Sequence, residues 1–525
     1  MERRDLLGDL AVLQFLDNSS KGTITPEQSI YQVIGVEPII NCRGTFTIIG
    51  GSVELPKVLA AIEEASRHFV QYDELAEGVG RRLAEITGAE WGMIPAGCAA
   101  GLKHVTAACV TGGNPEKLIR IPDLTGMLKT QVIAPKYSRN TYDHAVRNIG
   151  VEMVTVETPA ELACAINAKT AMIYLVAGEG TRAGQPLSLE TIVEIAKPAE
   201  VPVLVDAAAE DLTIPCIHLE KGADVVAYSG GKAMCGPQGA GLVLGDKKIL
   251  MSAWQASSPH HGPSRDNKIG REEIMGMLAA VEAWVARDHV AEWQTWLSRL
   301  DHIAQRVLQI AGVEVDVEQP SGLSNRSPTL VISWDSMVLH ITGEQVAEDF
   351  ARNKPRIAVG SGDAEGKTCI RITPSQMQPG NEEVVADRIY QILTEARCPL
   401  PTQLAVAEVD ISGHWDLIIE YFSSISQHQL YLQQEGNWIE GAHQSDFSSQ
   451  EIVGIVEGGQ VKLRSQVSQL GDAIPFLFSG RVSGDIVSGS IFLGEYLTAQ
   501  FTAKRSTYQK LREPFALPDG PPLAT

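Results

Sequence analysis

The sequence predicts an α/β protein with a smaller α+β domain after it and an all-β module at its end. Short, almost wholly apolar runs at 172–176 and 201–206 flank a helical stretch at 188–197, which is typical of a sheet buried on both faces. The pattern changes to α+β after residue 312, and the helical signal stops after 403. We expect a large α/β domain over 38–312, a small α+β domain over 313–398 and a β-meander over 405–510.

The elements of the large domain follow from hydrophobic spacing. Residues 1–37 suit a helical lead-in, and apolar residues three and four apart from Val53 to Ile86 predict helix up to Thr87-Gly88. Further apolar strands are expected at 224–229 and 240–245, followed by a long helical region over about 271–311. This order predicts a parallel or mixed sheet covered by helices.

The rest of the chain divides at a linker that contains prolines, 398–403. Before it, strands are expected at 329–334, 356–360 and 369–373, and helices at 343–353 and 382–396. After it, alternating runs separated by Gly, Asn and Asp predict a small barrel or sandwich. This module opens with Gly413-His414-Trp415, which resembles the start of lipocalin-like barrels. We expect it to dock or oligomerise rather than bind a ligand.

Composition excludes several classes of protein. The 525 residues carry 43 basic and 64 acidic side chains, a net charge of −21, which argues against nucleic acid as a main partner. No apolar run approaches the ~18 residues that span a bilayer, so we expect no membrane partner. Eight cysteines without a Cys-x-x-Cys pair suit reduced thiols in a cytoplasm. The adjacent His260 and His261 lack an evident third ligand, so no metal site is expected.

The most informative segment pairs an aspartate with a lysine. Asp206 ends an apolar strand, which places its carboxylate at the carboxyl edge of a parallel sheet, where ligands bind. Lys232 follows Ser229-Gly230-Gly231 after the next apolar strand, and a partly desolvated amine there becomes nucleophilic. Either residue alone would suit a structural role. Together, at this spacing, they match pyridoxal-phosphate enzymes with the aspartate-aminotransferase type of fold, where the lysine binds the cofactor covalently and the aspartate keeps its ring nitrogen protonated.

Several runs together carry a more specific resemblance. INCRGTFTIIGGS (40–52), TGAEWGMIPAGCAAGL (87–102), SRNTYDHAVRNIGVEMVTVE (138–157), SGGKAMCGPQGAGLVLG (229–245) and GREEIMGMLAAVEAW (270–284) occur in this order. They resemble the selenocysteine-synthase-like family, relatives of L-seryl-tRNA(Sec) selenium transferase, and within it the branch with glucosaminate-6-phosphate ammonia-lyase. The resemblance covers residues 38–397. It implies pyridoxal 5'-phosphate as cofactor, a small-molecule amino substrate, and a homodimer or higher homo-oligomer.

The resemblance also implies positions around the cofactor. The loop with Gly97, Cys98 and Ala99 matches the one that receives the cofactor phosphate, and a helix N-terminus there offers free backbone N–H groups. Ser229 is placed to donate a further hydrogen bond to the phosphate, and Ala208 is also expected to bind the cofactor. The residue that stacks on the ring is expected to be Tyr142 or His144.

The fold and the resemblance also suggest residues that bind the substrate. Arg371, on the strand at 369–373, stands where this fold commonly presents an arginine to a substrate carboxylate. Arg265 and Lys268 lie in a basic stretch that resembles one facing the site in this family. Thr45 and Ser52 match a glycine-bearing loop near the substrate end.

We interpret the chain as a pyridoxal-phosphate enzyme that acts on an amino acid or amino-sugar acid, by α,β-elimination through Lys232. An aminotransferase, a desulfurase-like enzyme or a selenium-transferase-like enzyme is the alternative with the same cofactor. A non-catalytic binding protein that uses the C-terminal β-domain is the alternative of another class.

Overall fold

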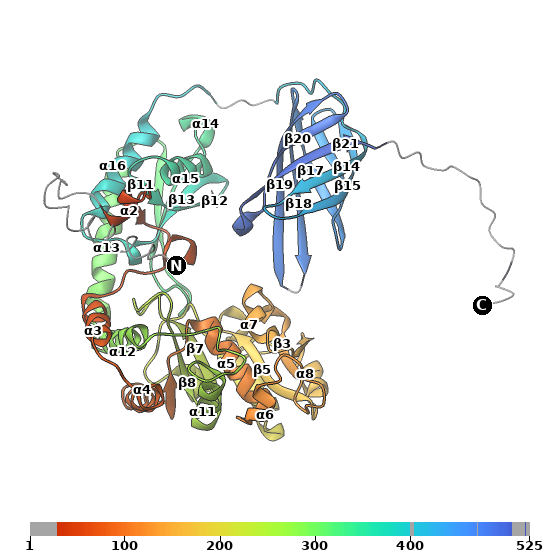
Figure 1. Ribbon diagram of the computed structural model, residues 1–525. Helices are drawn as coiled ribbons and strands as arrows, with labels where there is room; N and C mark the ends of the chain where they lie inside the picture. Colours follow the sequence, from red (N-terminus) through yellow and green to blue (C-terminus); the bar gives the residue numbers. More distant parts are fainter. Residues whose placement is uncertain (1–28, 400–403, 470, 507–519, 521–525) are drawn as a thin grey trace, which may run out of the picture. The chain divides into compact units, whose positions relative to one another are not determined.

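A computed structural model describes residues 29–399, 404–469, 471–506 and 520 (Figure 1). The chain divides into two compact units, one comprising 1–138 and 144–400 and the other 139–143 and 401–525. Most of the predicted helical lead-in lies outside the described residues; within it the structure shows α2 (Ile30–Val33). Among the described residues, no helix combines the length and apolarity needed to cross a bilayer.

The first unit is built on a seven-stranded mixed sheet in the order β2-β8-β7-β6-β5-β3-β4. Neighbouring strands are parallel from β4 to β7, and β8 runs antiparallel to both β7 and β2. The strands are β2 (Trp91–Met93), β3 (Gln131–Pro135), β4 (Glu152–Val156), β5 (Thr170–Val176), β6 (Val203–Asp206), β7 (Val225–Ser229) and β8 (Gly241–Gly245).

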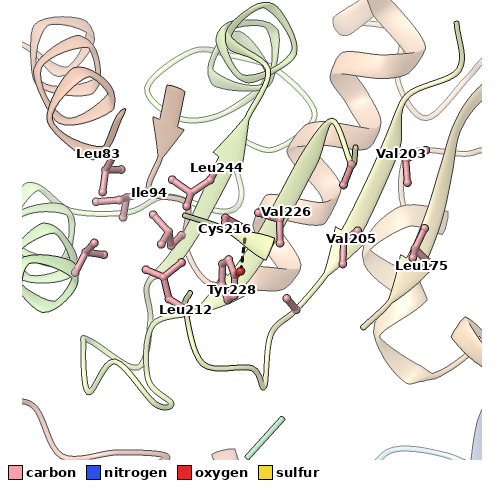
Figure 2. Packing of buried hydrophobic residues seen from close by; sticks show 14 of the residues in the cluster. Leu83, Ile94, Leu175, Val203, Val205, Leu212, Cys216, Val226, Tyr228 and Leu244 are labelled. Atoms are coloured by element: carbon pink, nitrogen blue, oxygen red, sulfur yellow. Dashed lines mark hydrogen bonds between the residues drawn. The ribbon is translucent and has the colours of Figure 1, made fainter. Parts of the chain in front are cut away.

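Helices cover both faces of this sheet, so successive strand residues enter two different cores. On β6, for example, Val203 and Val205 belong to one core and Leu204 to the other. Figure 2 shows members of the first core, among them Leu83 near Leu244 of β8 and Leu212 near Tyr228 of β7. The longer helices are α3 (Pro56–Ser66), α4 (Tyr72–Thr87), α5 (Cys98–Thr111), α8 (Pro159–Ala165), α9 (Leu189–Ala196), α11 (Lys247–Ala256), α12 (Arg271–Ala286) and α13 (His289–Val307), and the short ones are α6 (Pro115–Leu118), α7 (His144–Arg147) and α10 (Ile217–Glu220).

Two helical regions expected to be continuous are broken. The region 53–86 forms α3 and α4 with a break at 67–71, and the region 271–311 forms α12 and α13. The second break has a local cause, because the Asp288 carboxylate accepts hydrogen bonds from the N–H groups of Val290 and Ala291 and so caps a new helix.

A four-stranded antiparallel sheet, β12-β13-β10-β9, makes a third core with α13 and the helices after it. Its elements are β9 (Val313–Glu318), β10 (Thr329–Trp334), β12 (Gly360–Ala364), β13 (Lys367–Ile372), α14 (Ser336–Leu339), α15 (Gly343–Arg352) and α16 (Asn381–Thr394). The N-terminal strand β1 (Ile39–Asn41) pairs with β11 (Arg356–Ala358), and Cys42 packs into this core. The start of the predicted large domain therefore contributes to the small α+β part.

The second unit contains a closed antiparallel barrel of eight strands, which confirms the expected all-β module and selects the barrel over the sandwich. Its strands are β14 (Gly413–Glu420), β15 (Ile425–Glu435), β16 (Trp438–Gln444), β17 (Ser449–Glu457), β18 (Gln460–Gln469), β19 (Asp472–Ser483), β20 (Ile486–Phe492) and β21 (Thr498–Arg505). Pairing of β14 with β21 closes the ring. Trp415 is buried, and its indole N–H donates to the Ile411 carbonyl at 2.9 Å.

Candidate active site

Asp206 is a buried carboxylate held by three hydrogen-bond donors at the end of β6. Only 5% of its surface is exposed. The Tyr174 hydroxyl donates to Oδ2 at 3.2 Å, while the Ala208 N–H at 3.0 Å and the Cys98 thiol at 3.5 Å donate to Oδ1. Burial raises the pKa of this carboxyl, and the three donors and the positive charge of Lys232 act in the opposite direction. The site therefore contains a desolvated, pre-oriented carboxylate, whose two oxygens have the capacity to accept a further hydrogen bond.

Lys232 lies at the same edge of the sheet. The strands β6 and β7 are parallel neighbours with Asp206 opposite Ala227, and the chain reaches the lysine three residues after β7 ends. The approach is close-packed: a Cβ on Gly230 would lie 2.7 Å from the carbonyl oxygen of Ala240, so only glycine fits. This geometry brings the predicted aspartate and lysine together, because parallel strands present their carboxyl ends at one edge.

The loop after Lys232 is fixed by an arginine from the connection between α12 and α13. The Arg287 guanidinium donates to the carbonyl oxygens of Ala233 at 3.1 Å and Met234 at 3.5 Å. On the other side, the Ser52 N–H donates to the Gly231 carbonyl at 3.1 Å. Ser52 is buried, and this hydrogen bond places the predicted residue beside Gly231, which directly precedes the lysine.

The N-terminus of α5 is open to an anion. Gly97 precedes the helix with φ +90° and offers no side-chain cap, so the N–H groups of the first turn lack a capping partner in the described chain. Strand β8 approaches closely, since a Cβ on Gly241 would lie 2.7 Å from the backbone nitrogen of Cys98. An anion-binding helix end, a buried carboxylate and a lysine amine together fit the phosphate, ring nitrogen and carbonyl carbon of pyridoxal phosphate.

The structure shows a side-chain contact for Cys98 and a backbone contact for Ser229. The Cys98 thiol donates to Asp206, and burial raises the pKa of this thiol well above its ordinary value. Ser229 ends β7, and its N–H lies 3.4 Å from the Ala208 carbonyl oxygen.

The structure describes the surroundings of the remaining predicted residues. Arg371 pairs with Glu318 at 2.5 Å and does not line the cavity beside the lysine loop. Arg265 and Lys268 are exposed in the segment between α11 and α12. Tyr142 is 62% exposed and belongs to the second unit, whereas the exposed His144 begins α7 in the first. The structure thus gives Arg371 a protein partner in place of an open position for substrate.

A cavity of about 230 Å³ lies next to the lysine loop, and sequence reasoning missed most of its wall. Thr45 lines it as expected, together with Ala233 and Cys235 from the loop itself. Three arginines and three tryptophans complete much of the wall: Arg43, Arg287, Arg326, Trp284, Trp293 and Trp296. Arg43 stands in the run 40–52 that carried the family resemblance, so a signal for it was present. The tryptophans of α13 gave none, because they match an ordinary amphipathic helix.

This fold and site define a pyridoxal-phosphate enzyme. Residues 133–309 match the model of the aminotransferase class-V family. The D-glucosaminate-6-phosphate ammonia lyase of Salmonella typhimurium is 32% identical over 299 residues, which cover 55% of this chain and 78% of the relative. A solved structure of D-glucosaminate-6-phosphate ammonia-lyase shares 27% identity at a TM-score of 0.63, covering 70% of this chain and 98% of that one.

A second relative, the 5'-C-glycyluridine monooxygenase-decarboxylase of a Streptomyces species, is 27% identical over 378 residues, which cover 70% of this chain and 92% of the relative. The chain belongs to the aminotransferase class-V family. The predictions of an enzyme, of pyridoxal phosphate as its cofactor and of the aminotransferase-like fold are confirmed.

Proposed function

We propose that the chain releases ammonia from an amino-sugar acid or a related amino acid by α,β-elimination, with Lys232 and Asp206 as its catalytic residues. The observation that carries this is the juxtaposition of a buried, triply hydrogen-bonded Asp206 with Lys232 at one edge of the sheet. The named relative supports the choice of reaction within the family.

Asp206, the first turn of α5 and Lys232 have different roles in the proposed elimination. When bound, pyridoxal phosphate withdraws electrons from the Cα–H bond of the substrate. Asp206 holds the proton on the ring nitrogen, because its carboxylate is desolvated and cannot exchange that partner for water. The first turn of α5 holds the phosphate through backbone N–H groups. The Lys232 amine removes the Cα proton and hands it to the departing β-hydroxyl group, which leaves as water. Water then hydrolyses the released enamine to a 2-keto acid and ammonia.

The test separates elimination from transamination. Elimination yields ammonia and a 2-keto acid in equal amounts without a second substrate, whereas an aminotransferase requires a keto-acid acceptor and releases no ammonia. We expect the holoenzyme to form both products from D-glucosaminate or its 6-phosphate, and Lys232→Ala to form neither. Turnover that depends on added 2-oxoglutarate, without ammonia, would select the aminotransferase alternative.

We also propose a family branch, a cellular location, an oligomeric state and a domain division for the chain. The run 229–245 and the order of the other motifs support placement in the selenocysteine-synthase-like branch. Reduced thiols support a cytoplasmic location, since all eight cysteines are free. The fold class supports a homodimer or a larger homo-oligomer. The domain division at 313 and 405 is part of the proposal, with the catalytic residues confined to the first unit.

A further inference from the structure

The cavity beside the lysine loop has an unbalanced positive charge. Its wall contains three arginines but only two acidic residues, Asp211 and Glu292. Two of the arginines have partners: Arg287 lies 3.3 Å from Glu292, and Arg326 lies 3.7 Å from Asp211. Arg43 is the third, and in the described part of the chain no carboxylate lies within ion-pair distance of it.

The backbone of Arg43 is held by hydrogen bonds, whereas its guanidinium N–H groups have no hydrogen-bond partner among the described residues. The Asn41 carboxamide oxygen accepts the N–H groups of Arg43 at 3.0 Å and Gly44 at 3.1 Å, and its amide group donates to the Gly44 carbonyl at 2.9 Å. The guanidinium carbon lies 4.7 Å from the centre of the Phe46 ring. These contacts orient the backbone and stack one face of the guanidinium, but leave its N–H groups available.

The surroundings suit a carboxylate with a carbon chain behind it. Guanidinium and carboxylate match in a planar, two-bond geometry that a lysine does not reproduce. Trp293 and Trp296, with ring centres 5.8 Å apart, supply an apolar wall on α13. The same cavity is lined by Ala233, the residue after Lys232, so a molecule in it lies next to the reactive loop.

Arg371, the arginine expected for this task, is already engaged. Its guanidinium pairs with Glu318, and its side chain is one-third exposed on a face that does not reach this cavity. Recruiting it would cost the ion pair and leave Glu318 without a partner.

We propose that Arg43 binds the carboxylate of the amino substrate, and that Arg371 stabilises the small α+β part through Glu318. The proposal rests on the proposed function for the identity of the substrate as an amino acid. The proposal assigns the preference for amino acids over amines without a carboxylate to Arg43 in the N-terminal segment, rather than to Arg371 on β13.

Paired ligands test this assignment without relying on turnover. To prevent turnover, we would make each measurement in a Lys232→Ala background saturated with pyridoxal phosphate, which serves as the wild type of this comparison and carries the arginine substitutions. We would titrate it by calorimetry with D-glucosaminate and with 2-amino-2-deoxy-D-glucitol, in which CH₂OH replaces the carboxylate. Serine and 2-aminopropane-1,3-diol form a second, compact pair. We expect the wild type to prefer each acid by about 10- to 100-fold, the range of a charge-assisted pair. Arg43→Ala should lose this preference and leave the affinity for the alcohols unchanged, while Arg371→Ala should retain it.

The outcomes are distinct. Loss of the preference in Arg371→Ala but not in Arg43→Ala would overturn the proposal, and so would a wild type without any preference. An equal loss of affinity for acid and alcohol in Arg43→Ala would show a structural role only. Failure of elimination with an intact acid preference would refute the proposed function and leave this assignment standing.

Discussion

Replacing Tyr174 by phenylalanine removes one hydrogen-bond donor from Asp206 and leaves the buried ring in place. A hydrogen bond to a charged group contributes about 1.5–3 kcal/mol. The oxygen–oxygen distance of 3.2 Å exceeds the usual 2.7–2.8 Å, so we expect the lower end, about 1.5 kcal/mol. Because this hydrogen bond lowers the pKa of Asp206, its removal raises that pKa further.

The loss should depend on pH, because the donor stabilises the ionised carboxylate. It is full above the folded-state pKa of Asp206, which burial raises, and it shrinks as the pH falls through that value and the carboxyl becomes protonated. Urea unfolding of the cofactor-free protein between pH 4 and 8 measures it.

Tyr228→Phe is the matched control for this experiment. Tyr228 is 1% exposed, and its hydroxyl is hydrogen-bonded to the Cys216 sulfur at 3.3 Å rather than to a carboxylate (Figure 2). Its loss should not vary over this pH range. Equal, pH-independent losses in the two variants would refute the role assigned to Tyr174.

Three further predictions concern the phosphate loop, the cavity and the barrel. Gly241→Ala places a Cβ 2.6 Å from the carbonyl carbon of Gly97 and should weaken cofactor binding more than tenfold by equilibrium dialysis, whereas Gly239→Ala, with open space around it, should not. Burial raises the pKa of Asp211 to about 6. Relative to Asp211→Asn, the wild type should therefore lose up to about 3 kcal/mol of unfolding free energy as the pH rises from 4 to 6, and the difference should stay constant above pH 6. A difference in urea midpoints that does not change with pH would contradict this. A chain that ends at residue 400 should still bind pyridoxal phosphate, and a folded truncation without the cofactor's absorbance would show that 401–525 completes the site.

The main elements of the site follow from local sequence patterns. Asp206 and Lys232 were predictable because each follows a run of apolar residues, and parallel strands bring such ends together. The two clusters packed on the faces of the sheet have the same origin, since every position of strands such as 203–206 is buried.

Contacts that depend on register could not be predicted in this way. In the sequence, Tyr174 is indistinguishable from the other apolar residues of its strand. Its hydroxyl reaches Asp206 only because β5 pairs with β6 in a register that places Val176 opposite Asp206. The partner of Arg371 likewise lies two strands away on β9, at Glu318. The sequence does not distinguish a barrel from a sandwich, because alternating runs do not show whether the first strand pairs with the last.

Covalent attachment of the cofactor tests the central claim most directly. Borohydride reduction of the holoenzyme fixes pyridoxal phosphate to the lysine that holds it, and mass mapping of the digested protein identifies the labelled peptide. We predict that the label lies on Lys232, in the segment between β7 and β8, and that Lys232→Ala carries none. A label on any other lysine would contradict the assignment of the active site.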